Sequence, residues 1–429
     1  MRENAFSVLM ERGIVEYCSS PEDLKAAFDE GMVTAYVGFD PTASSLHVGH
    51  LIPIMGLAWL QRMGHRPIAI LGVGTGLIGD PSGKSKERNL LTLEQVEKNK
   101  VTVREQLAHF LDFREGPNSA KMISNYDWLG DLKLLDFLRD TGKHFSVNTM
   151  ISREYVKSRL DDPDKSISFT EFTYMLLQAY DFYYLSEHHD CLLQMGGNDQ
   201  QGNILAGVEL IRKKSGRQAF CLTYPLLLTS SGTKFGKTEE GAVWLSPELT
   251  SPYRFYQFWI NSEDAMVGRL LRLFTFLPNE EVETIVKIHE TRPERREAQK
   301  ILAFEVTRNV HGEHAAHGAR RASEILFGEN FEPADLDEEM IGILSKEVPS
   351  GEVDQPLPRP LADILVDSGA CQSKGEARRL IQGGGVLLNG EKANDPQASV
   401  DPSSCLAGGA LFLRLGKKRF HLAWAGKRQ

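Results

Sequence analysis

Two short apolar runs joined by a helical pattern constrain the fold of this chain more than any other feature. Tyr36-Val37-Gly38-Phe39 and Ile68-Ala69-Ile70-Leu71 have the composition of buried strands. Between them, apolar residues recur at helical spacing from Leu51 to Met63 and stop at Gly64, a residue suited to a helix end. A strand, a helix and a second strand in this order predict a right-handed βαβ crossover, and therefore a parallel sheet.

The turn that opens this helix carries His47-Val48-Gly49-His50. In a parallel crossover this end of the helix lies at the carboxyl edge of the sheet, where free backbone N–H groups form an anion site. Gly49 leaves room for a flat ring against the backbone, and the histidines can donate to phosphate oxygens. The turn therefore indicates a nucleotide site, although such a histidine pair is often only structural.

The composition is that of an ordinary globular protein of several domains, with 429 residues, 41% hydrophobic and 25% charged. No apolar run reaches membrane-spanning length, and the N-terminus lacks a signal-peptide pattern. The five cysteines are scattered, without zinc-ligand or redox spacing. These features predict a reduced, cytoplasmic compartment, no membrane and no structural metal.

Charge is distributed unevenly along the chain. The net charge of -9 argues against a general polyanion binder. From Pro356 to the end, however, 11 Lys and Arg stand against 6 Asp and Glu, a net +5, which leaves -14 for the rest. This asymmetry permits a basic, RNA-facing tail on an acidic body.

Four segments are expected from the patterning. Residues 1–232 alternate strand-like and helix-like stretches after a helical lead-in over about 1–31, which is an α/β pattern. Residues 233–345 begin with a lysine-bearing loop and continue as amphipathic helices. Residues 346–359 have the Pro- and Gly-rich composition of a linker, and 360–429 form a small α+β module.

Polar residues mark two further places in the α/β segment. Asp80 stands at the far end of a glycine-rich joint and could hold an ammonium group, although a plain tight turn is the alternative. Tyr174, Gln178 and Asp181 share one face of an apolar helix over 168–182. Polar groups on a buried helix need partners, so an internal hydrogen-bond network and a small polar ligand both remain open.

Two loops complete the set of candidate motifs. Gly196-Gly197 followed by Asp199 suits a turn at a strand end whose carboxylate takes ribose hydroxyls. Lys234 and Lys237 lie three apart in a glycine-punctuated loop, where mobile cations can neutralise a triphosphate. A solvated surface turn is the alternative for the second loop.

Taken together, these motifs resemble a known family. His47-Val48-Gly49-His50 followed by Lys234-Phe235-Gly236-Lys237-Thr238 resembles the paired signatures of class I aminoacyl-tRNA synthetases. With Asn125-Tyr126-Asp127-Trp128 and the 168–182 helix, the chain resembles bacterial-type tyrosyl-tRNA synthetases from about residue 5 to residue 424. The resemblance implies a Rossmann-like parallel-sheet catalytic domain, an all-α anticodon-binding domain and a small α+β alpha-L RNA-binding module. It also implies a homodimer, formed through the region around 137–150.

The resemblance also assigns roles to residues. It implies that Tyr36 and Asp181 hold the phenol hydroxyl of tyrosine. The remaining tyrosine contacts that it implies are Asp80, Tyr174, Gln178 and Gln200. The implied ATP contacts are Gly38, Asp40, Thr42, His47, Gly49, His50, Gly197, Asp199, Lys234 and Lys237. The implied catalytic residues are His47, His50, Lys84, Arg88, Lys234, Lys237 and Thr42.

The resemblance implies that the chain activates tyrosine with ATP, and the chemistry of this reaction fits these residue types. The tyrosine carboxylate itself attacks the α-phosphorus of ATP, so neither a protein nucleophile nor a general base is needed. The site must supply positioning and cationic stabilisation of the departing pyrophosphate. ATP is expected as a substrate with Mg²⁺ on its phosphates, and no protein-bound metal or prosthetic group is expected.

The C-terminal segment predicts a second, RNA-binding site. Two short helices over 360–381 precede a hairpin with an Asn389-Gly390 turn, an order that resembles the alpha-L motif. The basic residues expected to contact tRNA are Lys374, Arg378, Arg379, Lys417, Lys418 and Arg419. Phosphate contacts by such residues are salt-sensitive, and a solvated surface is the alternative.

The leading hypothesis is therefore ATP-dependent ligation of tyrosine to tRNA(Tyr). A tryptophanyl-tRNA synthetase-like enzyme is the nearest alternative, and a phenol clamp made by Tyr36 and Asp181 argues against an indole substrate. Small nucleotidyltransferases share the histidine motif but lack the lysine loop and the RNA module. A catalytically silent RNA-binding scaffold on the same fold is the remaining alternative.

Overall fold

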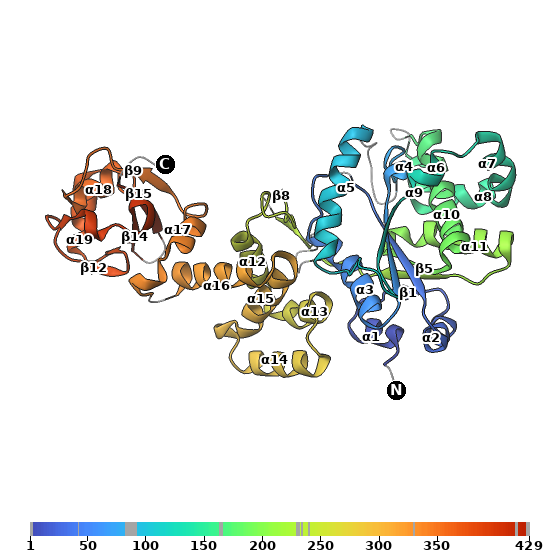
Figure 1. Ribbon diagram of the computed structural model, residues 1–429, viewed down its shortest axis with the longest axis horizontal. Helices are drawn as coiled ribbons and strands as arrows, with labels where there is room; N and C mark the ends of the chain where they lie inside the picture. The colour runs from blue at the N-terminus through green and yellow to red at the C-terminus, as the bar shows by residue number, and fades with distance from the viewer. Residues whose placement is uncertain are drawn as a thin grey trace. The chain divides into compact units, whose positions relative to one another are not determined.

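The computed structural model describes residues 3–41, 43–81, 92–162, 166–228, 232, 235–238, 241–328, 331–416 and 419–425. The chain divides into two compact units. The first holds Met1–Thr250 with Ser262–Leu302, and the second holds Ser251–Asn261 with Ala303–Gln429. Figure 1 draws both, from blue at the N-terminus to red at the C-terminus.

The first unit is built on a six-stranded sheet. In spatial order its strands are β1 (Tyr17–Cys18), β6 (Phe220–Tyr224), β5 (Cys191–Gly197), β2 (Thr34–Phe39), β3 (Arg66–Leu71) and β4 (Lys121–Ser124). Strands β2 to β6 pair in parallel, as expected, whereas β1 pairs antiparallel with β6. The predicted βαβ crossover is confirmed as β2, α3 (Leu51–Arg62) and β3.

The end of α3 confirms the role expected of Gly64. Its φ is 92°, a left-handed value that favours glycine. The next residue, His65, donates its N–H to the carbonyl of Leu60 at 2.9 Å, which closes the last turn. Strand β3 begins at the residue after His65.

The N-terminal lead-in differs from the expected helix. It consists of α1 (Ala5–Glu11), β1 and α2 (Pro21–Glu30). Tyr17 and Cys18 lie opposite Thr223 and Leu222, where they cover the free edge of β6. A strand of two residues is too short to leave a periodic pattern in the sequence, so the prediction missed it.

The first unit also holds the following helices, several of which pack beside the sheet (Figure 1). In chain order after α3 they are α4 (Val73–Gly76), α5 (Leu93–Ala108), α6 (Tyr126–Leu129), α7 (Leu134–Asp140), α8 (Val147–Ile151), α9 (Glu154–Leu160), α10 (Phe169–His189), α11 (Gln201–Ser215), α13 (Asp264–Phe274) and α14 (Asn279–Thr291). A small hairpin, β7 (Lys237–Thr238) and β8 (Gly241–Ala242), lies in the lysine segment.

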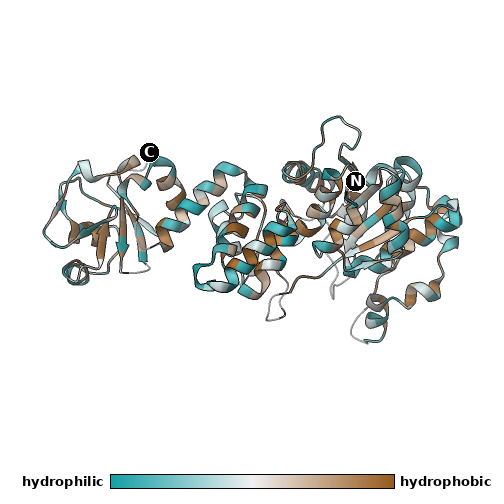
Figure 2. Ribbon diagram, turned by 90° about the horizontal axis from the view of Figure 1, so that it is seen from below, coloured by the Kyte–Doolittle hydropathy of each residue, from teal (hydrophilic) through white to brown (hydrophobic). Residues whose placement is uncertain are grey.

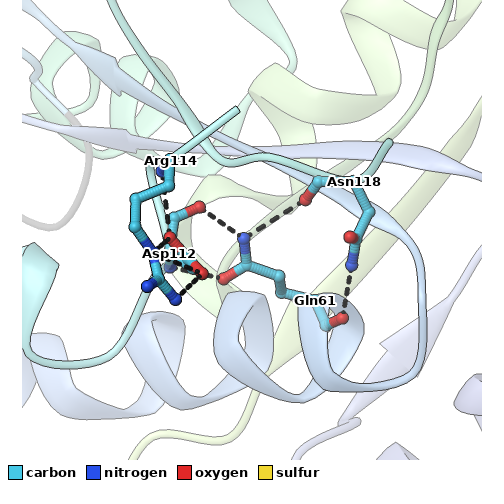
Figure 3. Close-up of polar contacts among 4 residues, drawn as sticks. All are labelled: Gln61, Asp112, Arg114 and Asn118. Carbon is cyan, nitrogen blue, oxygen red and sulfur yellow. Dashed lines mark hydrogen bonds and ion pairs between the residues drawn. The ribbon is translucent and has the colours of Figure 1, made fainter. Parts of the chain in front are cut away.

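The loop between α5 and β4 is fixed to the last turn of α3. Gln61 donates to the carbonyls of Asp112 and Asn118 at 2.7 and 3.2 Å, and it accepts the N–H of Asp112 at 2.8 Å. Asn118 donates back to the Gln61 carbonyl at 2.7 Å, and Arg114 pairs with the Asp112 carboxylate at 2.7 Å (Figure 3). The network holds β4 at its place in the sheet.

The second unit contains helices followed by a small sheet. Its helices are α12 (Pro252–Ile260), α15 (Glu297–His311, which begins in the first unit), α16 (Glu313–Phe327), α17 (Glu338–Leu344), α18 (Leu361–Asp367) and α19 (Lys374–Gln382). Its strands are β9 (Ser350–Glu352), β10 (Arg359–Pro360), β11 (Val386–Leu388), β12 (Glu391–Ala393), β13 (Ser399–Val400), β14 (Ala410–Leu415) and β15 (Arg419–Trp424). The five-stranded sheet runs β12-β11-β14-β15-β9.

The C-terminal order of elements agrees with the expectation. Strands β11 and β12 form the predicted hairpin, with φ of 51° at Asn389 and 92° at Gly390. Within the segment 346–359, expected as a linker, β9 pairs in parallel with β15. Strand β14 alternates between two cores: Leu411 and Leu413 face one, and Phe412 faces the other.

Hydropathy follows the same logic. In Figure 2 the helices alternate brown and teal along their length, as amphipathic helices do. Among the described residues, no helix is both long and apolar enough to cross a membrane.

Candidate active site

A cavity of about 630 Å³ lies at the carboxyl ends of β2, β3 and β5. Ligands of open α/β sheets characteristically bind at this edge. The cavity gathers the candidate residues for tyrosine and ATP from five separate stretches of the chain. Those that line it are Tyr36, Gly38, Asp40, His47, Gly49, His50, Asp80, Tyr174, Gln178, Asp181, Gly197, Asp199 and Gln200.

The other candidates for the phosphates are placed differently. Thr42, Lys84, Arg88 and Lys234 lie outside the described residues. The backbone of Lys237 is described, and it forms β7, opposite Ala242 of β8.

A long helix supplies the polar floor of the cavity. α10 begins at a capping box in which Ser168 and Glu171 bond each other's backbone N–H groups. A buried ion pair between Arg159 and Glu171, at 2.7 Å, fixes this end of the helix. Two turns further along, Tyr174, Gln178 and Asp181, which the spacing placed on one face of the helix, line the cavity.

Asp181 is a buried carboxylate held by two donors. The indole N–H of Trp128 donates to Oδ1 at 2.7 Å, and the amide of Asn125 donates to Oδ2 at 2.9 Å. Burial raises the pKa of Asp181 to about 7, and the two donors oppose that rise. The carboxylate keeps further acceptor capacity toward the cavity.

Tyr36 faces the same region from β2. Its ring meets Phe182 edge-on at 5.3 Å, and its side chain is 2% exposed. Within the described part of the chain, its hydroxyl has no hydrogen-bond partner. Burial, and then the charge of Asp181, raises the pKa of Tyr36 well above its usual value, so the hydroxyl stays a donor.

Two glutamines share this property. Gln178 and Gln194 both line the cavity, and among the described residues their buried side-chain oxygens have no hydrogen-bond partner. A buried polar group without a partner costs free energy, so such groups at a cavity wall indicate a polar ligand.

The same cavity is lined by a carboxylate and an amide that are in contact. Gln200 donates to Asp80 Oδ2 at 2.7 Å, and Asn203 donates to Gln200 Oε1 at 3.3 Å. Asp80 follows Gly79, whose φ of 86° turns the chain sharply at the end of the joint. The pair gives the cavity an anionic site suited to an ammonium group.

The histidine motif forms a tight 3-10 turn, Val48–His50. His50 Nδ1 accepts the N–H of His47 at 3.1 Å, and His47 Nδ1 accepts the N–H of Gly49 at 3.0 Å. Burial, and then the neighbouring His47, lowers the pKa of His50 to about 3, so its ring is neutral. With Nδ1 occupied as an acceptor, neutral imidazole carries its proton on Nε2, which leaves each ring one donor.

The expectation of free backbone N–H groups at this turn was wrong. Val48 donates its N–H to the Val243 carbonyl at 2.9 Å, and His50 donates to the His47 carbonyl at 2.8 Å. The Gly49 N–H is taken by His47. Bonds within the turn, together with the bond from Val48 to Val243, satisfy these donors, so the imidazole rings, rather than the backbone, present the donors at this end.

Glycines bring other polar groups close. A Cβ at Gly49 would lie 2.8 Å from the His47 ring, so glycine at this position leaves room for the His47 side chain. A Cβ at Gly197 would stand 2.5 Å from Asp199 Oδ1. The side chain of Asp199 therefore lies against the strand end, where the sequence predicted a ribose contact.

Some cavity residues were not assigned by the sequence. Asn125 is fully buried after β4 and also donates to Thr75 Oγ1 at 2.9 Å, while its oxygen accepts the Gly74 N–H at 2.8 Å. Asn125 and Trp128 belong to a motif that carried the family resemblance without a role. Their place directly after a strand of the sheet was the available signal.

The predicted tRNA contacts lie in the second unit and differ in environment. Lys374 pairs with Asp363 at 2.8 Å, and Arg419 pairs with Glu376 at 3.5 Å. Arg378 and Arg379 are exposed on α19. Lys417 and Lys418 lie outside the described residues.

Metal ligands and disulfides give no further site. In the described part of the chain, no group of three or more His, Cys, Asp or Glu side chains is placed to hold a metal ion. All five cysteines are free thiols.

The fold and the cavity define a class of protein that sequence comparison identifies. The family model of class I tRNA synthetases (W and Y) matches residues 29–328, and the model of the C-terminal domain of tyrosine–tRNA ligase (SYY-like) matches residues 340–423. The chain belongs to the class I tRNA synthetases of the tryptophan and tyrosine group.

Its relatives narrow the class. The chain is 50% identical over 411 residues to the tyrosine–tRNA ligase of Roseiflexus castenholzii, covering 94% of this chain and 95% of that one. It is 49% identical over 420 residues to that of Geobacillus stearothermophilus, covering 96% and 98%. A C-terminally truncated mitochondrial tyrosyl-tRNA synthetase from Aspergillus nidulans shares the fold with a TM-score of 0.69 and 33% identity, over 76% of this chain and 95% of that structure.

The activity of the chain is therefore the ligation of tyrosine to tRNA, with ATP as a substrate. The tryptophanyl alternative does not hold, because the relatives that cover nearly the whole chain act on tyrosine. Tryptophanyl-tRNA synthetase structures, at 13% and 14% identity, share the fold alone.

Proposed function

We propose that tyrosine binds with its phenol between Tyr36 and Asp181 and its ammonium group beside Asp80 in the same cavity. The Tyr36 hydroxyl donates to the phenol oxygen, and the phenol donates to Asp181. The proposed ammonium and backbone contacts are Asp80, Tyr174, Gln178 and Gln200. The buried Tyr36 hydroxyl carries this proposal, because it faces a cavity that also holds a buried carboxylate and has no partner among the described residues.

ATP is proposed to bind beside the histidine turn, with its triphosphate toward the Nε2 donors of His47 and His50. The further contacts proposed are Gly38, Asp40, Thr42, Gly49, Gly197 and Asp199, with Lys84, Arg88, Lys234 and Lys237 at the phosphates. A neutral His50 ring suits this role, since its Nε2 donates one hydrogen bond without carrying a charge into the cavity wall. Mg²⁺ is proposed to arrive on the triphosphate of the substrate.

The proposed reaction has two steps. A tyrosine carboxylate oxygen forms a bond to the α-phosphorus, and the bond from that phosphorus to the β-phosphate oxygen breaks, releasing pyrophosphate. A terminal ribose hydroxyl of tRNA(Tyr) then attacks the tyrosyl carbonyl, and AMP leaves. The chain positions both reactants and offsets the charge that develops on pyrophosphate.

A homodimer is proposed through an apolar surface next to the catalytic cavity. Leu134, Leu135 and Leu138 on α7 are 69%, 79% and 46% exposed, and Val147 on α8 is 58% exposed. Phe169, at the start of α10, is 78% exposed. These elements pack on one buried cluster, and so many exposed apolar side chains around it suit a surface that a second copy covers.

The domain division and the RNA contacts are also proposed. Catalysis is assigned to 1–232, the lysine loop and anticodon binding to 233–345, a connecting segment to 346–359, and RNA binding to 360–429. The exposed pair Arg378 and Arg379 on α19 supports the last assignment. We also propose a cytoplasmic location, which the free, scattered cysteines support.

The experiment for the tyrosine site is amino-acid-dependent exchange of pyrophosphate into ATP. The Asp181→Asn variant should lose most tyrosine-dependent exchange while its ATP affinity, measured by equilibrium binding, stays near that of the parent protein. Unchanged exchange in this variant would remove Asp181 from the phenol site.

A further inference from the structure

A buried glutamine outside the cavity links the histidine turn to the segment that follows the lysine hairpin of β7 and β8. Gln106 lies near the end of α5, is 9% exposed, and is not among the residues that line the cavity. Its oxygen accepts the N–H of Leu46 at 2.9 Å, and its amide donates to the Ser45 hydroxyl at 2.8 Å. One side chain therefore holds both residues that precede His47.

Ser45 extends the connection to a distant part of the chain. Its hydroxyl also accepts the N–H of Ser246 at 3.0 Å and donates to the Leu46 carbonyl at 2.7 Å. Ser45 and Ser246 are 3% and 6% exposed, so these bonds form away from water. Each is stronger in such surroundings, and the loss of one partner leaves the other buried and unpaired.

The two segments pair as a short ladder. The Leu245 N–H donates to the Leu46 carbonyl at 2.8 Å, and the Val48 N–H donates to the Val243 carbonyl at 2.9 Å. Between these bonds, His47 lies opposite Trp244, with ring centroids 6.0 Å apart. The histidine motif is thus registered against residues 243–246.

Residues 243–246 continue directly from the lysine hairpin. The Val243 N–H donates to the Gly236 carbonyl at 3.1 Å, next to Lys237 in β7. A Cβ at Gly236 would meet Val48 Cβ at 3.3 Å and the Gly49 nitrogen at 3.4 Å, so the two motifs lie in direct contact there. A shift of residues 45–48 would therefore move the histidines relative to the lysine hairpin.

We propose that Gln106 is a positioning residue for adenylate formation, which keeps the histidine turn and the lysine hairpin in one register around the triphosphate. The inference rests on the phosphate roles proposed for His47 and Lys237. Phosphoryl transfer depends on positioning, and a displacement of about 1 Å costs on the order of a hundredfold in rate. The phenol site is built from β2 and α10, so its affinity for tyrosine does not depend on this register.

The test compares two glutamine-to-methionine variants on the same helix. Gln106→Met keeps the approximate volume but removes both hydrogen bonds. Gln95→Met is the matched control, since exposed Gln95 accepts the Thr92 N–H at 3.1 Å in the capping box of α5 and touches neither motif. The rate constant for tyrosyl-adenylate formation is measured by stopped flow, per active site titrated, together with the dissociation constant for tyrosine.

Gln106→Met is expected to lower the rate constant per active site by about tenfold to a hundredfold, with tyrosine affinity within about twofold of the parent protein. Gln95→Met should leave both values unchanged per active site, even if thermal stability falls. An unchanged rate constant in Gln106→Met, or an equal loss of tyrosine affinity, would overturn the proposal, because a purely structural role changes the number of active sites rather than the rate at each.

A conservative variant covers the case in which Gln106→Met does not fold. Gln106→Glu keeps an acceptor for Leu46 and can accept from the Ser45 hydroxyl, so its rate constant should lie between those of the parent protein and Ser45→Ala. A Ser45→Ala rate constant equal to that of the parent protein, or a Gln106→Glu rate constant below that of Ser45→Ala, would contradict the proposal.

Two reference variants separate this inference from the phosphate roles beneath it. If His47→Ala and Lys237→Ala slow adenylate formation and Gln106→Met does not, only the positioning role fails. If His47→Ala and Lys237→Ala leave the rate unchanged, the proposed phosphate roles fail, and the role of Gln106 fails with them.

Discussion

Trp128 donates its indole N–H to Asp181 at 2.7 Å and stacks on Tyr184 at 4.4 Å, with the two rings 14° from parallel. The stack fixes the plane of the indole, and the plane aims the N–H at the carboxylate. Asp181 and Tyr184 both lie on α10, one turn apart. One helix thus supplies the carboxylate and the support for its donor.

Removal of that donor should weaken tyrosine binding. Trp128→Phe keeps an aromatic ring against Tyr184 but loses a hydrogen bond to a charged group, which is worth roughly 1.5–3 kcal/mol. The dissociation constant for tyrosine, measured by calorimetry, should rise about tenfold or more, while ATP affinity stays unchanged. Tyr184→Phe, which retains a stacking ring, is the control and should bind tyrosine as the parent protein does. Equal affinities in Trp128→Phe and the parent would mean that the indole does not support the phenol site.

The Tyr36 hydroxyl should contribute to discrimination against phenylalanine. Tyr36→Phe removes the donor proposed for the phenol oxygen and leaves the edge-on contact with Phe182 intact. The ratio of kcat/KM for tyrosine to that for phenylalanine should fall by about fivefold to thirtyfold, the range of one neutral hydrogen bond to a buried partner. Pyrophosphate exchange with each amino acid gives the ratio. A ratio that stays constant would place the phenol elsewhere.

Tyrosine binding should strengthen as pH rises through about 7, because burial raises the pKa of Asp181 to about 7. The ionised carboxylate accepts the phenol hydrogen bond, so the ligand favours that form, lowers the pKa of Asp181 and releases protons on binding. The folding stability of the protein without tyrosine depends on pH in the opposite direction. The folded state holds this proton more tightly than the unfolded chain, so the contribution of Asp181 to stability falls as pH rises from about 4 to about 7.

Calorimetry in buffers of different ionisation enthalpy measures this linkage. Proton release on tyrosine binding should be present near pH 6 and absent near pH 8, roughly one unit to either side of the pKa. Asp181→Asn should show neither the release nor the rise in affinity. Phenylalanine, which offers no hydroxyl, should bind no more tightly at the higher pH. Proton uptake by the parent protein on binding tyrosine would refute the assignment.

The sequence predicted those helices and strands in which apolar residues recur at a regular spacing. The crossover around α3 and the polar face of α10 followed from this spacing. For the polar face, an internal hydrogen-bond network and a polar ligand were both left open, and the structure has features of each. Asp181 takes part in an internal network, and Gln178 lines the cavity with a side-chain oxygen that has no partner among the described residues. A pattern within one helix shows which side chains share a face, but it cannot show which neighbours the fold brings to them.

The contacts that escaped prediction join residues far apart in the chain. Gln106 meets Ser45 across 61 positions, and Ser45 meets Ser246 across 201. The backbone donors of the histidine turn were expected to be free, but the turn uses them itself, and Val48 donates to Val243. Hydrogen bonds of this kind depend on tertiary placement, and one sequence carries no periodic signal for them.

Charge on the apolar surface of α7 should dissociate the proposed dimer. Leu135 is 79% exposed, and Leu135→Asp should yield a monomer in sedimentation velocity at micromolar concentration, since a buried unpaired carboxylate disfavours the interface. Val101→Asp, at a position on α5 that is 58% exposed, is the matched control and should sediment as the parent protein does. A parent protein that is itself monomeric, or a Leu135→Asp variant that remains dimeric, would exclude this surface.

Reversal of charge on α19 should affect tRNA and spare amino-acid activation. Arg378→Glu places a carboxylate on the exposed basic face, so it should raise the KM for tRNA while pyrophosphate exchange stays unchanged. It should also lower the slope of log affinity for tRNA against log salt concentration by about one. Lys346→Glu changes the same charge at an exposed position of the same unit outside α19. If both variants charge tRNA equally well, Arg378 makes no phosphate contact; if both are equally impaired, net charge rather than the face of α19 controls tRNA binding.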